Sequence, residues 1–333
     1  MAEFYEQVKE RLMRYARINT ESNPHSTSVP TTSCQHDLAK VIYEELQQIG
    51  ATNVYYDKDT CVVYGSLEAN VKTGRAIGFV THMDTAPDAS GKDVKPWVLE
   101  NYDGKDIVLN AEKDIVMSPS VFPNLKQYIG QDLILTDGTT LLGGDDKASI
   151  AAVMTVLEYL VKHPEIKHNF ISVAFTPDEE VSGLAKDLDL ERFKSPIAYT
   201  LDGDHLGYYM DETFNASLST IEIHGISVHT ATAKGIMKNA VDIGNAFLNK
   251  LPALEKPQYT QGREGFYHVV SFNGDCEYAK IEINVRDHDS LQFDIRNNTL
   301  KMIVDMLNEE YGQGTVNITQ RIQYRNLKEV IDQ

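Results

Sequence analysis

The stretch IGFVTHMD, residues 77–84, shows how the first part of the chain folds, because an apolar run leads directly into His82 and Asp84. Such a run predicts a buried strand with polar groups at its carboxyl end. Three further segments lead into acidic residues: LTDGTTLLGG (135–144) before Asp145, ISVAFTP (171–177) before Asp178, and IAYTL (197–201) before Asp202. Ligands of open α/β sheets bind beyond the carboxyl ends of the strands, so these distant side chains have a reason to converge.

Hydrophobic periodicity extends this pattern over residues 1–207. Apolar residues at helical spacing predict helices over 2–17, 35–49 and 146–162. Short β-rich runs predict strands at 52–56, 61–67, 75–81, 169–175 and 197–201. Prolines and glycine turns indicate that 83–144 is a loop with small strands. Strands that alternate with helices imply an α/β domain with a mostly parallel sheet.

The pattern changes near residue 207. The expected elements are then strand 216–224, helix 238–251, strands 266–272 and 278–286, helix 289–311 and strand 314–321. This order is βαββαβ, the ferredoxin-like α+β arrangement. We therefore expect an α/β domain over 1–207, to which 322–333 returns, and an inserted lid or dimerisation-type domain over 208–321.

Composition excludes several classes of partner. The chain has 333 residues and a net charge of −18, and such a surface repels phosphate backbones and anionic membranes. The longest apolar stretch, near 150–161, is too short for a membrane span, and the N-terminus lacks the apolar core of a secretory signal. The three widely spaced cysteines indicate reduced thiols and a cytoplasmic location.

The acidic residues at the strand ends favour a metal site. Taken singly, each motif is more simply a helix cap or a solvated face. Together, several carboxylates and one imidazole would repel each other strongly without a cation. One imidazole with carboxylates suits Zn²⁺, and a bridging carboxylate could serve two ions. Of the adjacent Glu179 and Glu180, one could be a ligand and the other a general base, while Asp84 would orient the ring of His82.

Several segments resemble the peptidase T family, di-zinc tripeptide aminopeptidases of the aminoacylase and carboxypeptidase clan. They are THMDTAPDASGKDVKP, TDGTTLLGGDDKASIA, HPEIKHNFISVAFTPDEE, AYTLDG, AKGIMKNA, EGFYHV and VRDHD. The resemblance implies a hydrolase that releases the N-terminal residue from tripeptides, with two zinc ions per chain. It leaves a homodimer open as the oligomeric state.

The resemblance also implies roles for individual residues. In the α/β domain, His82 and Asp202 would hold one zinc, Glu180 the other, and Asp145 would bridge both. Glu179 would be the general base and acid, Asp84 would support His82, and the Asp145–Asp146 peptide would be cis.

Two residues of the inserted domain would bind substrate. His229 would help to stabilise the oxyanion, and Arg286 would capture the C-terminal carboxylate of the peptide. The simpler alternatives are a partly buried histidine at 229 and a salt bridge from Arg286 to Asp287 or Asp289.

The sequence departs from the family at its end. Members of the family run further and carry a second histidine ligand there, so the α/β domain is expected to be C-terminally incomplete. The second zinc would then have only Asp145 and Glu180, whereas catalytic zinc usually has three protein ligands. We expect a weakened second site and impaired hydrolysis. His205 is a less favoured substitute ligand, since a place on the rim is simpler.

Two alternatives remain open. The first is a catalytically inactive relative that binds peptide or metal, or that pairs with a complete subunit. The second is a related metallohydrolase that cleaves another amide, which the segments TAPDASGK and EGFYH disfavour.

Overall fold

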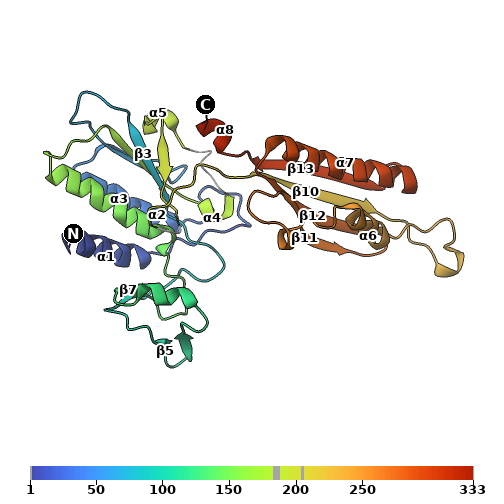
Figure 1. The fold of residues 1–333 in the computed structure, drawn as a ribbon, viewed down its shortest axis with the longest axis horizontal. Helices are drawn as coiled ribbons and strands as arrows, with labels where there is room; N and C mark the ends of the chain where they lie inside the picture. Colours follow the sequence, from blue (N-terminus) through green and yellow to red (C-terminus); the bar gives the residue numbers. More distant parts are fainter. Residues whose placement is uncertain (1, 183–187, 204–205, 333) are drawn as a thin grey trace. The chain divides into compact units, whose positions relative to one another are not determined.

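The computed structural model describes residues 2–182, 188–203 and 206–332. The chain divides into two compact units, Met1–Asp204 and His205–Gln333 (Figure 1). The domain limits suggested by the sequence, 1–207 with 322–333 and 208–321, stay a prediction beside this division. Among the described residues, no helix has the length and apolar character needed to cross a membrane.

A five-stranded sheet forms the centre of the first unit. Its strands are β1 (Thr52–Tyr56), β2 (Val63–Leu67), β3 (Ile77–His82), β8 (Ile171–Thr176) and β9 (Ala198–Thr200), in the order β1-β2-β8-β3-β9. β3 runs parallel to both β8 and β9, whereas β2 pairs antiparallel with β1 and β8. The α/β class is confirmed, and the sheet is mixed because the short 57–62 connection makes β1 and β2 a hairpin.

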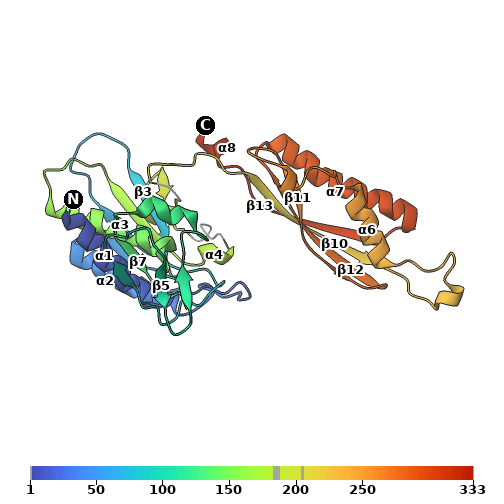
Figure 2. The same cartoon turned by 60° about the horizontal axis from the view of Figure 1, so that its bottom comes forward.

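Three long helices pack with this sheet: α1 (Ala2–Ala16), α2 (Gln35–Ile49) and α3 (Gly144–Lys162) (Figures 1 and 2). Their apolar faces share one buried core with the sheet, including Tyr15, Leu38, Leu46, Ile150, Met154 and Phe175. The helices predicted from periodicity are confirmed within about two residues of their limits. Two short helices, α4 (Glu179–Ser182) and α5 (Leu190–Phe193), follow β8.

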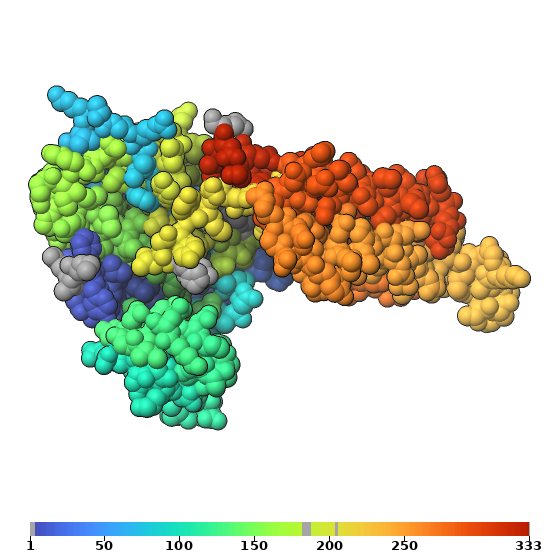
Figure 3. Space-filling model, in the orientation of Figure 1, coloured from blue at the N-terminus to red at the C-terminus, as the bar shows by residue number. Residues whose placement is uncertain are grey.

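Residues between β3 and α3 build a small lobe of the first unit, drawn in green and teal in Figure 3. It contains the antiparallel pair β4 (Trp97–Leu99) and β7 (Leu133–Leu135), and the pair β5 (Ile107–Asn110) and β6 (Ile115–Met117). A 3-10 helix, η1 (Pro123–Tyr128), connects β6 to β7 along the chain. The prediction of a loop with small strands is therefore confirmed.

The second unit is an antiparallel sheet with two helices on one face. Its elements are β10 (Asn215–His224), α6 (Ala240–Lys250), β11 (Phe266–Gly274), β12 (Tyr278–Asp287), α7 (Ser290–Tyr311) and β13 (Val316–Tyr324). Two 3-10 helices, η2 (Thr230–Thr232) and η3 (Pro257–Tyr259), and a terminal helix α8 (Lys328–Ile331) complete it. The strand order β11-β12-β10-β13 and the βαββαβ succession confirm the ferredoxin-like prediction.

Candidate active site

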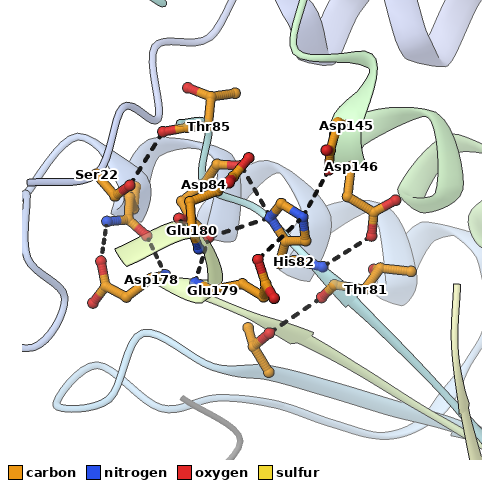
Figure 4. Close-up of polar contacts among 12 residues, drawn as sticks. Ser22, Thr81, His82, Asp84, Thr85, Asp145, Asp146, Asp178, Glu179 and Glu180 are labelled. Carbon is orange, nitrogen blue, oxygen red and sulfur yellow. Dashed lines mark hydrogen bonds and ion pairs between the residues drawn. The ribbon is translucent and has the colours of Figure 1, made fainter. Parts of the chain in front are cut away.

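His82, the last residue of β3, lies at the centre of the candidate site (Figure 4). Its side chain is only 2% exposed, and both ring nitrogens face oxygen atoms. Nδ1 lies 3.1 Å from the backbone oxygen of Asp84 and 3.3 Å from its Oδ1. Nε2 lies 2.9 Å from Oδ1 of Asp145. The ring is thus oriented from one side by Asp84 and presents Nε2 to a carboxylate on the other.

Asp145 and Asp146 lie at the start of α3, and their side chains serve different groups. The Asp145 side chain, which is 67% exposed, faces the imidazole. Asp146 is buried, and its Oδ2 accepts a hydrogen bond of 3.1 Å from the backbone N–H of His82. The peptide bond between the two residues is cis, as the family resemblance implied. The Asp145 carboxylate is therefore available as a metal ligand, while the Asp146 carboxylate fixes the end of β3.

Asp84 joins His82 to the start of α4. Its carboxylate is fully buried and accepts hydrogen bonds from the backbone N–H groups of Glu179, at 2.9 Å, and Glu180, at 3.2 Å. This leaves the Glu179 side chain 44% exposed, with its Oε2 4.0 Å from Nε2 of His82. The candidate base is consequently accessible and lies beside the imidazole.

Three side chains meet the geometric requirement for a shared cation. One ligand atom from each of His82, Asp145 and Asp202 lies within 4.8 Å of the others. In residues 2–182, 188–203 and 206–332, this is the one such group of histidine, cysteine and acidic side chains. The prediction that distant strand ends converge is borne out for these three positions.

The electrostatics of the site show an excess of negative charge. Burial, and then repulsion from Asp145, raise the pKa values of Glu180 and Asp202. Burial also raises the pKa of Glu179, to which repulsion from Asp202 adds. Burial alone would favour the neutral imidazole, but the hydrogen bond with Asp84 and the nearby carboxylates raise the pKa of His82 to about 10. A bound cation would relieve this repulsion.

His229 and Arg286 both lie in the second unit, and each is described within that unit. His229 is exposed and precedes η2, where its Nδ1 accepts a hydrogen bond of 3.2 Å from the N–H of Ala231. Arg286 lies on β12, half-buried, with its guanidinium 5.4 Å from the ring centre of Phe214. Neither simpler alternative is observed, because His229 is exposed and, among the described residues, Arg286 has no carboxylate within salt-bridge distance.

The sequence pattern named Asp178 only as an acidic residue at a strand end, and it missed both its supporting role and its partners Thr31 and Gln35. Asp178, at φ +60°, has a buried carboxylate that accepts hydrogen bonds from the N–H of Thr31, at 2.8 Å, and from Nε2 of Gln35, at 2.7 Å. These bonds join the α4 turn to the N-terminal segment. The position of Asp178 directly before Glu179 was the only signal available. His205, the less favoured substitute ligand, lies outside the described residues.

Comparison with known proteins agrees with the motifs. Residues 212–315 match the family model for the peptidase dimerisation domain. The chain is 47% identical to peptidase T of Clostridium novyi over 328 residues, which cover 98% of this chain and 80% of that protein. It is also 47% identical to peptidase T of Alkaliphilus oremlandii, over 97% of this chain and 80% of that relative.

Solved structures show the same fold. The aminopeptidase PepT of Bacillus cereus superposes with a TM-score of 0.75 at 20% identity, covering 98% of this chain and 79% of that one. A tripeptidase of Staphylococcus aureus gives a TM-score of 0.73 at 19% identity, over 96% and 76% of the two chains. The resemblance drawn from the motifs is confirmed, and the chain belongs to the peptidase T family.

Proposed function

We propose that this chain is a metal-dependent aminopeptidase that releases the N-terminal residue from tripeptides. The observation that carries the proposal is the group formed by His82, Asp145 and Asp202, whose ligand atoms lie within 4.8 Å of one another. Membership of the peptidase T family supports the same reaction, as does the similarity to a tripeptidase of known structure.

The donor atoms of the site fit zinc. A buried imidazole nitrogen together with carboxylate oxygens is a ligand set typical of catalytic Zn²⁺. His82 and Asp202 would hold one ion, Glu180 a second, and Asp145 would bridge them. When bound, such ions polarise the peptide carbonyl and lower the pKa of a water molecule.

Glu179 would carry the proton during hydrolysis. Its side chain is 44% exposed, so a peptide and a water molecule can reach it. Asp84 holds its backbone N–H at 2.9 Å, which fixes where the side chain begins. The carboxylate would take a proton from the attacking water and deliver it to the leaving amine, so that the first residue is released.

The second unit would supply groups that bind the peptide. Because Nδ1 of His229 accepts a hydrogen bond from Ala231, the neutral ring carries its proton on Nε2. That N–H is suited to stabilise an oxyanion. The guanidinium of Arg286 would bind the C-terminal carboxylate of the tripeptide.

The second unit would also mediate homodimer formation. Its match to the peptidase dimerisation domain supports this assembly. The helix α7 exposes a stripe of apolar side chains at helical spacing: Leu291 (67% exposed), Ile295 (46%), Met302 (63%) and Met306 (50%). An exposed stripe of this kind is typical of an interface between subunits.

A second candidate function is a catalytically inactive relative that binds peptide or a single metal, or that pairs with a complete subunit. It is favoured by the ligand count, because the described residues form one three-ligand group and leave Asp145 and Glu180 for a second ion. Catalytic zinc usually has three protein ligands, so we expect a weakened second site and slow hydrolysis.

A cytoplasmic location stays a prediction that the three free cysteines support.

Release of alanine from trialanine, measured with added zinc, tests the function. We expect turnover that a chelator abolishes and that falls by about 10²- to 10⁴-fold in Glu179→Ala. Glu112→Ala, at an exposed position of the small lobe, is the matched control and should keep the parental rate. Absence of turnover in the zinc-loaded parental chain would favour the inactive relative.

A further inference from the structure

Arg286 lies in a row of residues that crosses the sheet of the second unit. It is paired with Phe266 on β11 and with Ala216 on β10, and Ala216 is paired in turn with Tyr324 on β13. Residues directly opposite each other in antiparallel strands share a face of the sheet. The neighbouring Val285 belongs to the core with α6 and α7, so Arg286 and its row lie on the opposite face.

Two aromatic rings border the guanidinium. Its central carbon lies 5.4 Å from the ring centre of Phe214 and 6.0 Å from that of Tyr324, and the two ring centres are 5.9 Å apart. The small side chain of Ala216, between Arg286 and Tyr324 in the row, leaves room for the guanidinium to extend across β10. These distances are within the range of cation–π attraction.

The hydrogen bonds of Arg286 leave one edge of the guanidinium available. Nη1 donates to the backbone oxygens of Val285, at 3.1 Å, and Ser217, at 3.4 Å. Within the described ranges, Nε and Nη2 have no hydrogen-bond or ion-pair partner. These two N–H groups form a fork that matches the two oxygens of a carboxylate.

The neighbouring carboxylates are occupied elsewhere. Asp287 forms an ion pair with Arg296, with 3.1 Å between Nη1 and Oδ2. Asp289 caps α7, where it accepts a hydrogen bond of 2.8 Å from the N–H of Gln292. The positive charge of Arg286 is therefore half-buried and not neutralised by either neighbour.

We propose that Phe214 and Tyr324 are positioning residues that hold the Arg286 guanidinium with its Nε–Nη2 edge ready for the C-terminal carboxylate of a peptide. They thereby set the preference for peptides with a free C-terminus. This inference rests on the proposed function of Arg286. The rings restrict the guanidinium before the peptide arrives, so less side-chain freedom is lost on binding.

Binding of trialanine and trialanine amide, measured by calorimetry with zinc in the Glu179→Ala background, tests the proposal without turnover. We expect the acid to bind more tightly than the amide. Phe214→Leu and Tyr324→Leu should each weaken binding of the acid by about 2- to 5-fold and leave the amide unchanged. Tyr324→Phe keeps the ring and should restore the preference, which a general loss of packing would not allow.

Tyr278→Leu is the matched control. Tyr278 lies on β12 of the same sheet and is also a partly exposed aromatic residue, but its hydroxyl bonds to Glu222 and it does not contact Arg286. It should leave both affinities unchanged. Equal binding of acid and amide to the parental chain, or no binding of either, would overturn the proposal. So would an equal loss for acid and amide in the leucine variants. If the parental chain hydrolyses trialanine but binds the acid and the amide equally, only the proposal about Phe214 and Tyr324 is contradicted. If it binds the acid more tightly than the amide but does not hydrolyse trialanine, only the hydrolytic function is contradicted.

Discussion

Oδ1 of Asp84 lies 3.3 Å from Nδ1 of His82, and neither side chain has appreciable contact with solvent. The same carboxylate binds the backbone at the start of α4. Asp84 therefore sets both the orientation of the imidazole and the position of the candidate base. A single substitution at this residue should disturb metal binding and proton transfer together.

Asp84→Asn should lower the affinity for zinc by about 10- to 100-fold, because an amide orients the imidazole less strongly than a carboxylate does. Competition with a chromophoric chelator measures the change. Asp88→Asn, at an exposed position on the same segment, is the control and should retain parental affinity. Equal affinity in the two variants would show that Asp84 does not support His82.

Asp146→Ala should destabilise the first unit by about 1–3 kcal/mol, because the buried N–H of His82 loses its acceptor. It should also weaken zinc binding, since the end of β3 is no longer fixed. Urea denaturation of the metal-free chain measures the first effect separately from the second. Unchanged stability would contradict the role given to this carboxylate.

Arg11→Met should reduce stability by about 3 kcal/mol, because Arg11 joins three helices through a buried ion pair. Its Nε bonds to Glu45 of α2 at 2.7 Å, and its Nη1 bonds to Thr155 of α3 at 2.8 Å. Arg17→Met, which changes an exposed arginine just after α1, should cost less than about 0.5 kcal/mol. Similar denaturation midpoints for the two variants would refute the assignment.

Met302→Asp should shift the chain from dimer to monomer, because it places a charge in the exposed apolar stripe of α7. Light scattering after size-exclusion chromatography measures the molar mass. Lys301→Asp, at the adjacent exposed residue outside the stripe, is the control. A parental monomer, or a dimer that survives Met302→Asp, would exclude this face as the interface.

Much of the first unit follows from the sequence, because helix periodicity and strand ends are local features. The convergence of His82, Asp145 and Asp202 was predictable since β3 and β9 are parallel and carry their carboxyl ends to the same edge. The antiparallel direction of β2 relative to β1 follows from the short 57–62 connection, but the position of β2 beside β8 was not predictable. A short strand such as Val63–Leu67, buried along its whole length, carries no information about which distant strand becomes its second neighbour.

The side-chain partners were less predictable because they depend on residues distant in the sequence. Local reasoning paired Arg286 with Asp287 or Asp289, yet Asp287 binds Arg296 and Asp289 caps the next helix. Likewise, the local pattern alone did not show which of Asp145 and Asp146 faces the imidazole, whereas the family resemblance pointed to Asp145, the residue that does so. That choice follows from the backbone at Asp145, with φ −78° and ψ 107°, at the non-helical start of α3.

Anomalous X-ray diffraction at the zinc absorption edge, from crystals of the chain grown with zinc, tests the central claim most directly. The account predicts a strong peak about 2.0–2.2 Å from Nε2 of His82 and from carboxylate oxygens of Asp145 and Asp202. It should disappear in crystals of Asp202→Ala. A zinc-loaded chain with no peak among these three side chains, or with its peaks elsewhere, would contradict the account.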